Sequence, residues 1–299
     1  MKNVFLALIM LGFSVSHAAA CINEYYDHTK LSGKYEELLD VPNTSAKFFR
    51  HGFDRDVLKK QKAELVAADS SFKNLSDLAL IELKIGDRQK GVAMLEELYK
   101  KHPGEYNIAA NLGTGYELTG RNSEAYALLK KAVTLNPQSH EGSEWIHLKI
   151  LEQKLQPKPD YTKIINLNIP PGITAYYNKL NDRQLRDLDT LKNQLIFQLR
   201  ERIAFVPPKD SVVSQLLIDL ADVVAITESA EGAESMYRLA ATYAPEENSL
   251  IESRLNEMAD VLRFKPVQKY WYVGVIAMGI AGFAWRITHR RRKLRRAEF

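Results

Sequence analysis

The stretch NLGTGYELTGRNSEAYALLKKAVTLNP, residues 111–137, decides the fold class of this chain. Its Gly113-Thr114-Gly115 looks at first like a phosphate-binding loop, but a dinucleotide fingerprint needs a third glycine where Leu118 stands. No β-branched run precedes the glycines to form the required strand, and the pattern G-x-x-x-x-G-K-[ST] occurs nowhere in the chain. The glycines therefore serve a purpose other than holding a nucleotide.

Residues 106–139 instead form one unit of a 34-residue repeat that contains two helices. Large apolar residues lie on one helix face, small residues stand where the helices would cross, a glycine separates the helices and a proline ends the second. In order, these residues are Leu112, Gly113, Tyr116, Gly120, Ala125, Leu129, Ala132 and Pro137. The preceding unit, 72–105, matches except that Glu82 replaces an apolar residue. Its matching residues are Leu75, Leu78, Ala79, Gly86, Gly91, Leu95, Leu98 and Pro103.

Two further segments follow the pattern only in part. Residues 140–155 supply a first helix without a partner, because Pro157 and Pro159 interrupt the chain, and we expect this half-unit to cap the stack. Residues 214–247 form a degenerate unit in which Glu228 stands in place of the glycine between the helices. A helical hairpin that matches by chance is the alternative interpretation of this last segment.

These units resemble the tetratricopeptide repeat, clearly over 70–155 and more weakly over 214–247. The resemblance implies helical hairpins stacked into a solenoid, with the first helix of each hairpin lining an inner groove. It implies a scaffold that binds other proteins and has no catalytic activity. The groove positions that it predicts here are Lys73, Asp77, Asn107, Asn111, Thr114, Glu117, Trp145 and Leu148.

Two of these groove residues carry specific expectations. Asn111 stands where many members of the family use an asparagine to bind the backbone of a peptide. Trp145 is suited to anchor an apolar side chain of a partner, as buried tryptophans do in many interfaces. The alternative is that the groove positions pack against the N-terminal segment of the same chain.

The rest of the body is predicted to be helical, which makes the fold class all-α. The repeat region spans 54–155 and begins with a helix at 54–69, and a linker with several prolines follows at 156–180. A helical region at 181–264 opens with one long amphipathic helix, in which leucines recur every three or four residues. Residues 21–53 give no periodic signal, and their structure is left open.

The first twenty residues have the pattern of a secretory signal peptide: one lysine, an apolar core and three alanines before the cleavage site. An uncleaved amphipathic helix is the alternative. Cleavage after Ala20 would make Cys21 the first residue of the mature chain, and it is the only cysteine. Its position resembles a bacterial lipoprotein signal, although Ala18 stands where a leucine is usual. Cys21 is therefore either lipidated or a free thiol.

The C-terminal end is predicted to cross a membrane. Residues 270–285 carry no charge, and with their flanks they predict a transmembrane helix at 268–288 with aromatic residues at both ends. A buried core helix is the alternative. The tail, 289–299, is rich in Lys and Arg, which favours a cytoplasmic position and attraction to anionic lipid headgroups. The rest of the chain is mildly acidic, so we expect no nucleic-acid partner.

No catalytic constellation stands out in the sequence, and we expect no cofactor. His140, Glu144 and His147 share one helical face, but polar surface residues of a capping helix explain them more simply than a metal site does. The sequence therefore predicts an exported, membrane-anchored scaffold that binds another cell-envelope protein, with its body in the periplasm or outside the cell. A lipoprotein whose C-terminal segment is a removed sorting signal is the alternative, and a metal-dependent hydrolase is a distant one.

Overall fold

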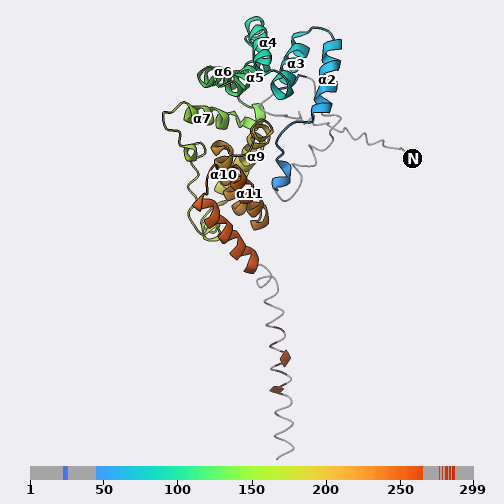
Figure 1. Cartoon of the computed structure of the whole chain (residues 1–299). Coiled ribbons are helices and arrows are strands. Elements are labelled where there is room, and N and C mark those ends of the chain that lie inside the picture. Colours follow the sequence, from blue (N-terminus) through green and yellow to red (C-terminus); the bar gives the residue numbers. More distant parts are fainter. Residues whose placement is uncertain are drawn as a thin grey trace, which may run out of the picture.

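The described part of the chain consists of helices and their connections, and it contains no strand (Figure 1). It is a computed structural model that covers residues 23–25, 45–264 and scattered positions between 276 and 286. The N-terminal group of helices comprises η2 (Ala46–Phe48), α2 (Arg55–Ala67), α3 (Phe72–Ile85), α4 (Arg88–Lys101), α5 (Tyr106–Leu118) and α6 (Asn122–Leu135). There follow η3 (Ser139–Gly142), α7 (Glu144–Lys154), η4 (Tyr161–Lys163), α8 (Ile173–Tyr177), α9 (Asp182–Phe205), α10 (Ser211–Thr227), α11 (Ala230–Tyr243) and a helix at 249–264. The all-α prediction is confirmed for these residues.

Consecutive antiparallel hairpins form a repeat-like helical solenoid. Helices α3 and α5 begin at Phe72 and Tyr106, and α4 and α6 begin at Arg88 and Asn122, so both helices recur after 34 residues. Figure 1 shows α2 to α6 side by side in the upper part of the molecule, with α9 to α11 below them. The predicted 34-residue period is therefore observed in the two hairpins α3–α4 and α5–α6.

Within each of the two hairpins, the paired helices cross closely at a small residue. A Cβ atom on Gly113 of α5 would lie 2.8 Å from Leu129 Cγ on α6. In the preceding hairpin the small residue is on the second helix, where a Cβ on Gly91 would lie 2.9 Å from the carbonyl oxygen of Ala79. Leu129 and Ala79 are fully buried, so neither partner has free space into which it could move.

The departure from the repeat pattern at Glu82 has a structural reason. Its carboxylate is almost fully buried and accepts hydrogen bonds from Lys62 Nζ on α2 at 2.9 Å and Lys90 Nζ on α4 at 2.8 Å. Burial opposes ionisation of Glu82, but these two lysines outweigh it and lower its pKa. The polar residue thus ties α2 to the first hairpin, which explains why an apolar side chain is absent there.

The half-unit begins later than the sequence predicts. A helix is expected from residue 140, whereas α7 begins at Glu144. His140 and Glu141 have φ angles of 53° and 54°, in the left-handed region, and therefore interrupt the helix within the short η3 turn. The boundary moves because His140 makes contacts outside its own helix, which are described below.

The C-terminal helices form the largest apolar cluster. Helix α9 starts with a capping box at Asn181 and buries Leu195, Leu199 and Ile203 of the predicted stripe. Helices α10 and α11 pack on it as an antiparallel hairpin, which confirms the hairpin at 214–247 although α10 already begins at Ser211. Alanines occur in both helices where the repeat pattern expects small residues, and both of them, Ala221 and Ala233, are fully buried.

A buried polar cluster joins the helix at 249–264 to this hairpin. The guanidinium of Arg254 lies 2.9 Å (Nε) from Asp222 Oδ1 of α10, and Tyr237 of α11 donates a hydrogen bond to the same carboxylate. Arg254 also donates to the carbonyl oxygens of Ile169 and Pro170, at 2.7 and 3.1 Å, in the proline-containing linker. Arg254 therefore links its own helix to α10 and to the linker, and Tyr237 joins α11 to the same carboxylate.

The segment before α2 attaches the N-terminal helices to the C-terminal ones. Gly52 N–H donates to the carbonyl of Ala204 at 3.0 Å, and the Phe53 and Phe205 rings meet edge to face at 4.7 Å. Ala46 N–H donates to Ser235 Oγ of α11 at 3.0 Å. Residues 45–53, which lack any periodic signal, are thus placed by contacts with helices far away in the sequence.

The predicted membrane elements lie outside the continuous described ranges. These are the leader at 1–20, Cys21, the span at 268–288 and the tail at 289–299. Within the residues that the structure describes, no helix has both the length and the apolar character needed to cross a bilayer.

Candidate functional site

The first helices of the two hairpins, α3 and α5, hold a short piece of the chain itself, residues 23–25. Asn111 on α5 has no exposed surface, and its amide forms two hydrogen bonds with the main chain of Asn23. Asn111 Oδ1 accepts from Asn23 N at 2.7 Å, and Asn111 Nδ2 donates to Asn23 O at 2.9 Å. Both bonds engage backbone atoms, so this contact does not depend on the identity of residue 23.

Asp77 on α3 makes a similar contact two residues further along the segment. Its Oδ1 atom accepts a hydrogen bond from Tyr25 N at 2.8 Å, and Asp77 is only 2% exposed. The Tyr25 ring lies edge to face with Phe72, with centroids 5.5 Å apart, and its hydroxyl donates to Glu105 Oε2 at 3.0 Å. Burial, followed by this contact with Glu105, raises the pKa of Tyr25.

The side chains of residues 23 and 24 also have dedicated partners. Glu24 forms an ion pair with Lys84 at the end of α3. The side-chain oxygen of Asn23 lies 3.1 Å from His140 Nε2. The other ring nitrogen of His140 is hydrogen-bonded to Glu144, and its ring stacks on Phe197 of α9 with centroids 4.8 Å apart. His140 is thereby held between α7 and α9, which accounts for its unusual backbone angles.

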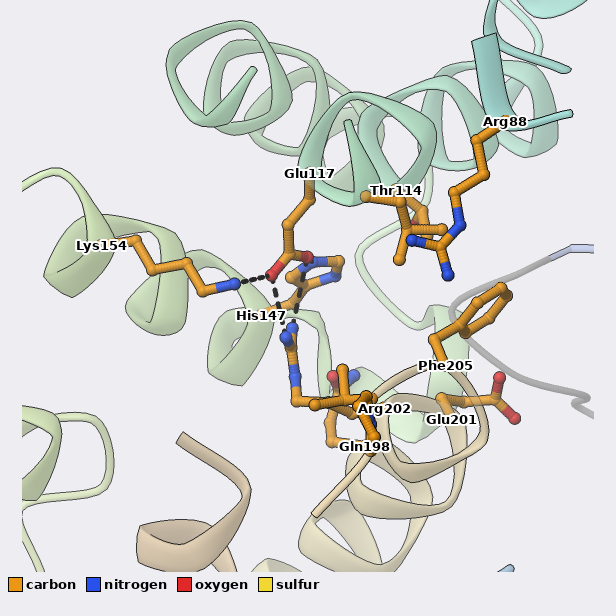
Figure 2. Close-up of a pocket in the computed structure, with 12 residues that line it drawn as sticks. Arg88, Thr114, Glu117, His147, Lys154, Gln198, Glu201, Arg202 and Phe205 are labelled. Atoms are coloured by element: carbon orange, nitrogen blue, oxygen red, sulfur yellow. Dashed lines mark hydrogen bonds and ion pairs between the residues drawn. The ribbon is translucent and has the colours of Figure 1, made fainter. Parts of the chain in front are cut away.

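A cavity of about 260 Å³ lies beside this segment, between α5, α7 and the C-terminal end of α9 (Figure 2). Figure 2 shows three basic side chains that converge on the carboxylate of Glu117. His147 Nε2 and Lys154 Nζ each lie 2.6 Å from this carboxylate, and Arg202 Nη1 lies 2.8 Å from it. Burial opposes the charge of Glu117, but the charges of Arg202, His147 and Lys154 prevail and hold its pKa well below the usual range.

The opposite wall of the cavity combines apolar and charged groups. Phe205, Pro207 and Leu118 supply the apolar surface, and Arg88 of α4 reaches toward the cavity from the N-terminal helices (Figure 2). Glu201 also lines the cavity, and burial raises its pKa to about 7 against the opposing influence of nearby cations. The charge of Lys84 lowers the pKa of Glu201 and that of Glu24 raises it.

The predicted groove positions fall into several environments. Asp77 and Asn111 bind the segment directly, and Lys73 Nζ lies 5.7 Å from the Tyr25 ring centroid. Thr114 and Glu117 line the cavity. Asn107 is half-buried in the first turn of α5, and Leu148 packs on the apolar cluster between α5 and α6. These positions therefore gather on one side of the hairpins, but only some of them contact the segment.

Trp145 lies apart from the segment. Its indole N–H donates to Gln194 Oε1 on α9 at 3.0 Å, and its ring packs against the C-terminal apolar cluster. Sequence reasoning considered a bound partner or residues 21–53 as the neighbour of this tryptophan, and its described neighbours are instead those of α9. The indole is half-buried against this cluster.

The residues that complete the site were not identified from the sequence. Residues 23–25 carry no periodic signal, and nothing near them in the chain indicates that they pair with α3 and α5. Glu105 and Phe72 were assigned no binding role, and His140 was considered only as part of a metal or surface cluster. Among the residues that the structure describes, no group of three or more His, Cys, Asp or Glu side chains is arranged to hold a metal ion.

The fold and the site together define a helical-repeat protein whose inner face holds an extended segment. No protein-family model matches the chain, and no curated protein matches it by sequence. A function is therefore argued from the contacts of the groove.

Proposed function

We propose that this chain is a tetratricopeptide-repeat scaffold that binds an extended segment of another protein and performs no catalysis. The observation that carries the proposal is the pair of hydrogen bonds between the Asn111 amide and the main chain of Asn23. A side chain that binds backbone atoms from a fully buried position is suited to hold any segment of the same shape. This is the role that the family resemblance assigns to the asparagine at this position.

Four features support the assignment to this repeat class. The helices recur after 34 residues, and small residues stand at the crossings, as Gly113 and Gly91 illustrate. Gly120 has a φ angle of 82°, in the left-handed region that favours glycine, at the turn between α5 and α6. The Asn111 side chain faces the groove and not the interior between the paired helices, since its partner is a distant segment.

We further propose that the body is exported and that a C-terminal helix anchors it in a membrane. The supporting observations are the apolar leader, the uncharged stretch at 270–285 and the basic residues that follow it. Protease added to spheroplasts should then digest the body and leave a small protected C-terminal fragment, and full protection of the body would contradict this topology. The mass of the mature protein distinguishes this anchor from a lipoprotein modified at Cys21 that has lost its C-terminal segment.

The binding function is tested by photo-crosslinking in intact cells. A photoreactive residue at Lys73, on the exposed rim beside the segment, should capture a partner, whereas the same residue at Lys100, on the outer helix α4, should not. Asn111→Ala should lower the yield at Lys73 roughly 2- to 12-fold, because a net hydrogen bond contributes about 0.5–1.5 kcal/mol. An undiminished yield from a folded Asn111→Ala chain would show that the partner binds elsewhere.

A further inference from the structure

We propose that residues 23–25 are an internal ligand that occupies the groove, and that they specify the partner's chemistry: an extended segment carrying an amide, an acidic and an aromatic side chain, in this order. This inference rests on the proposed peptide-binding function and adds the specificity of the groove to it. It also implies that a partner must displace the chain's own segment before it can bind.

The main-chain contacts define a register that follows the repeat. Asn111 and Asp77 are 34 residues apart and occupy the same position of their two units, the sixth residue counted from Tyr106 and Phe72. They bind the backbone of residues 23 and 25, which are two residues apart. The two repeat units therefore engage residues that are two positions apart in the segment. The segment therefore crosses the groove in one direction, from α5 to α3.

The third equivalent position ends this series. Trp145 occupies it in the half-unit, and its indole is bound to Gln194 of α9. The neighbouring contact comes from His140, which meets the side chain of Asn23 and not the backbone. The groove therefore contacts the side chain of Asn23, the first described residue of the segment, through His140. His140 is held by Glu144 and Phe197, so it presents a fixed ring nitrogen to the side-chain oxygen of Asn23.

The next two side chains of the segment meet groups of complementary character. Glu24 pairs with Lys84, and both side chains are less than one fifth exposed, so this ion pair is shielded from the solvent. Tyr25 places its ring on Phe72 and its hydroxyl on Glu105. A basic residue in place of Glu24 would make Lys84 face a like charge. An apolar residue in place of Tyr25 would leave Glu105 without this hydrogen-bond donor.

The internal segment competes with any partner because it belongs to the same chain. A tethered ligand acts at an effective concentration that is on the order of millimolar for short connections. Nineteen residues separate Tyr25 from Ser45, where the described chain resumes. The next residue, Ala46, is hydrogen-bonded to Ser235 of α11. A free peptide should consequently bind the intact protein far more weakly than it binds a protein whose own segment has been disabled.

The test uses the purified full-length chain and a fluorescent peptide with the sequence of residues 22–27, INEYYD, followed by fluorescence anisotropy. Tyr25→Pro in the protein removes both the N–H that Asp77 accepts and the ring that packs on Phe72. We expect this variant to bind the peptide at least about ten-fold more tightly than the wild type, because the internal competitor is lost. Tyr25→Phe is the graded comparison: it keeps the N–H and the ring and loses only the hydroxyl bond to Glu105, so it should release the groove much less than Tyr25→Pro does.

The side-chain order is tested in the same assay. A peptide of identical composition with the order reversed, IYENYD, keeps the glutamate opposite Lys84 but exchanges the amide and aromatic side chains. It should bind the Tyr25→Pro variant at least about ten-fold more weakly, since the tyrosine bond to Glu105 and the asparagine contact with His140 are both lost. Lys84→Glu in that variant should weaken binding of INEYYD and strengthen binding of INKYYD, in which a lysine replaces the glutamate. Glu24→Lys in the protein provides a second way to disable the internal segment, and circular dichroism checks that each variant is folded.

The outcomes separate this inference from the proposed function. Equal binding of INEYYD to the wild type and to both disabled variants would overturn the internal-ligand assignment. Equal binding of both peptide orders, still weakened by Asn111→Ala, would overturn the specificity while leaving the peptide-binding function intact. Suppose that no folded variant binds the peptide and that Asn111→Ala leaves the crosslink yield at Lys73 unchanged. The partner would then not use this groove, and both the internal-ligand inference and the proposed peptide-binding function would be refuted.

Discussion

Replacing Gly113 by leucine should destabilise the repeat hairpin formed by α5 and α6. The Cβ of any new side chain at this position would lie 2.8 Å from Leu129 Cγ and 3.3 Å from Leu129 Cδ2. Real Cβ atoms essentially never approach another heavy atom more closely than 3.0 Å. Leu129 has no exposed surface and lies in a cluster of fully buried alanines, so it cannot yield without opening the crossing between the two helices.

The expected cost follows from two opposing effects. Overpacking of a well-packed core costs about 1–3 kcal/mol, and a whole leucine belongs at the upper end of this range. Removing a glycine from a helix interior returns about 1 kcal/mol, because leucine favours the helix. The net destabilisation should therefore be about 2 kcal/mol, which corresponds to a fall in melting temperature of roughly 4–8 °C for a body of this size.

Thermal unfolding of the purified full-length chain, followed by circular dichroism, measures this effect. Gly104→Leu is the matched control, because a Cβ at Gly104 meets no atom within 4 Å. Hydrogen exchange should locate the loss of protection in α5 and α6. A Gly113→Leu chain that melts at the wild-type temperature would show that the close crossing with Leu129 is absent, and would refute the packing argument.

Three further predictions concern buried polar groups. Glu117→Gln should cost about 3 kcal/mol, because it removes the buried negative charge on which Arg202, His147 and Lys154 converge. Chemical denaturation measures this, and a change below about 1 kcal/mol would speak against the network. Burial raises the pKa of Asp219 from 3.8 to about 8. The stability that this protonated acid contributes is complete below about pH 4 and is lost as the pH rises through about 8. Asp219→Asn should therefore flatten the pH profile of the melting temperature, and an unchanged profile would contradict the assignment. Trp145→Phe should cost about 1 kcal/mol through the lost bond to Gln194 while leaving peptide binding unchanged, and weakened binding would place the indole in the groove.

Helix positions could be predicted because their signals are local. Asn181 and Gln184 are three residues apart and form the capping box that starts α9 where the leucine stripe begins. Pro103 and Pro137 follow the second helices of the two hairpins. A repeated pattern of small and apolar residues also predicts which helices pair, because every hairpin repeats the same crossing.

Departures from the pattern could not be interpreted in the same way. Glu82 looks like a defect in a repeat until Lys62 on α2, twenty residues away, is seen to pair with it. The start of α7 moves from residue 140 to Glu144 because His140 leaves the helical conformation to meet Asn23 and Phe197. In each case a distant charged or aromatic partner outweighs the local preference.

The sequence by itself determined the helical hairpins, their 34-residue period and the helix faces that become buried, because these depend on residues within about two turns of each other. It also marked Asn111 as a residue directed into a groove. Only the tertiary structure decided what that groove contains, since Asn23 and Asn111 are 88 residues apart and no periodicity encodes their contact. The same holds for Glu117, whose partners come from α7 and α9. Such pairings depend on how the hairpins stack on the C-terminal helices, and that arrangement exists only in the folded chain.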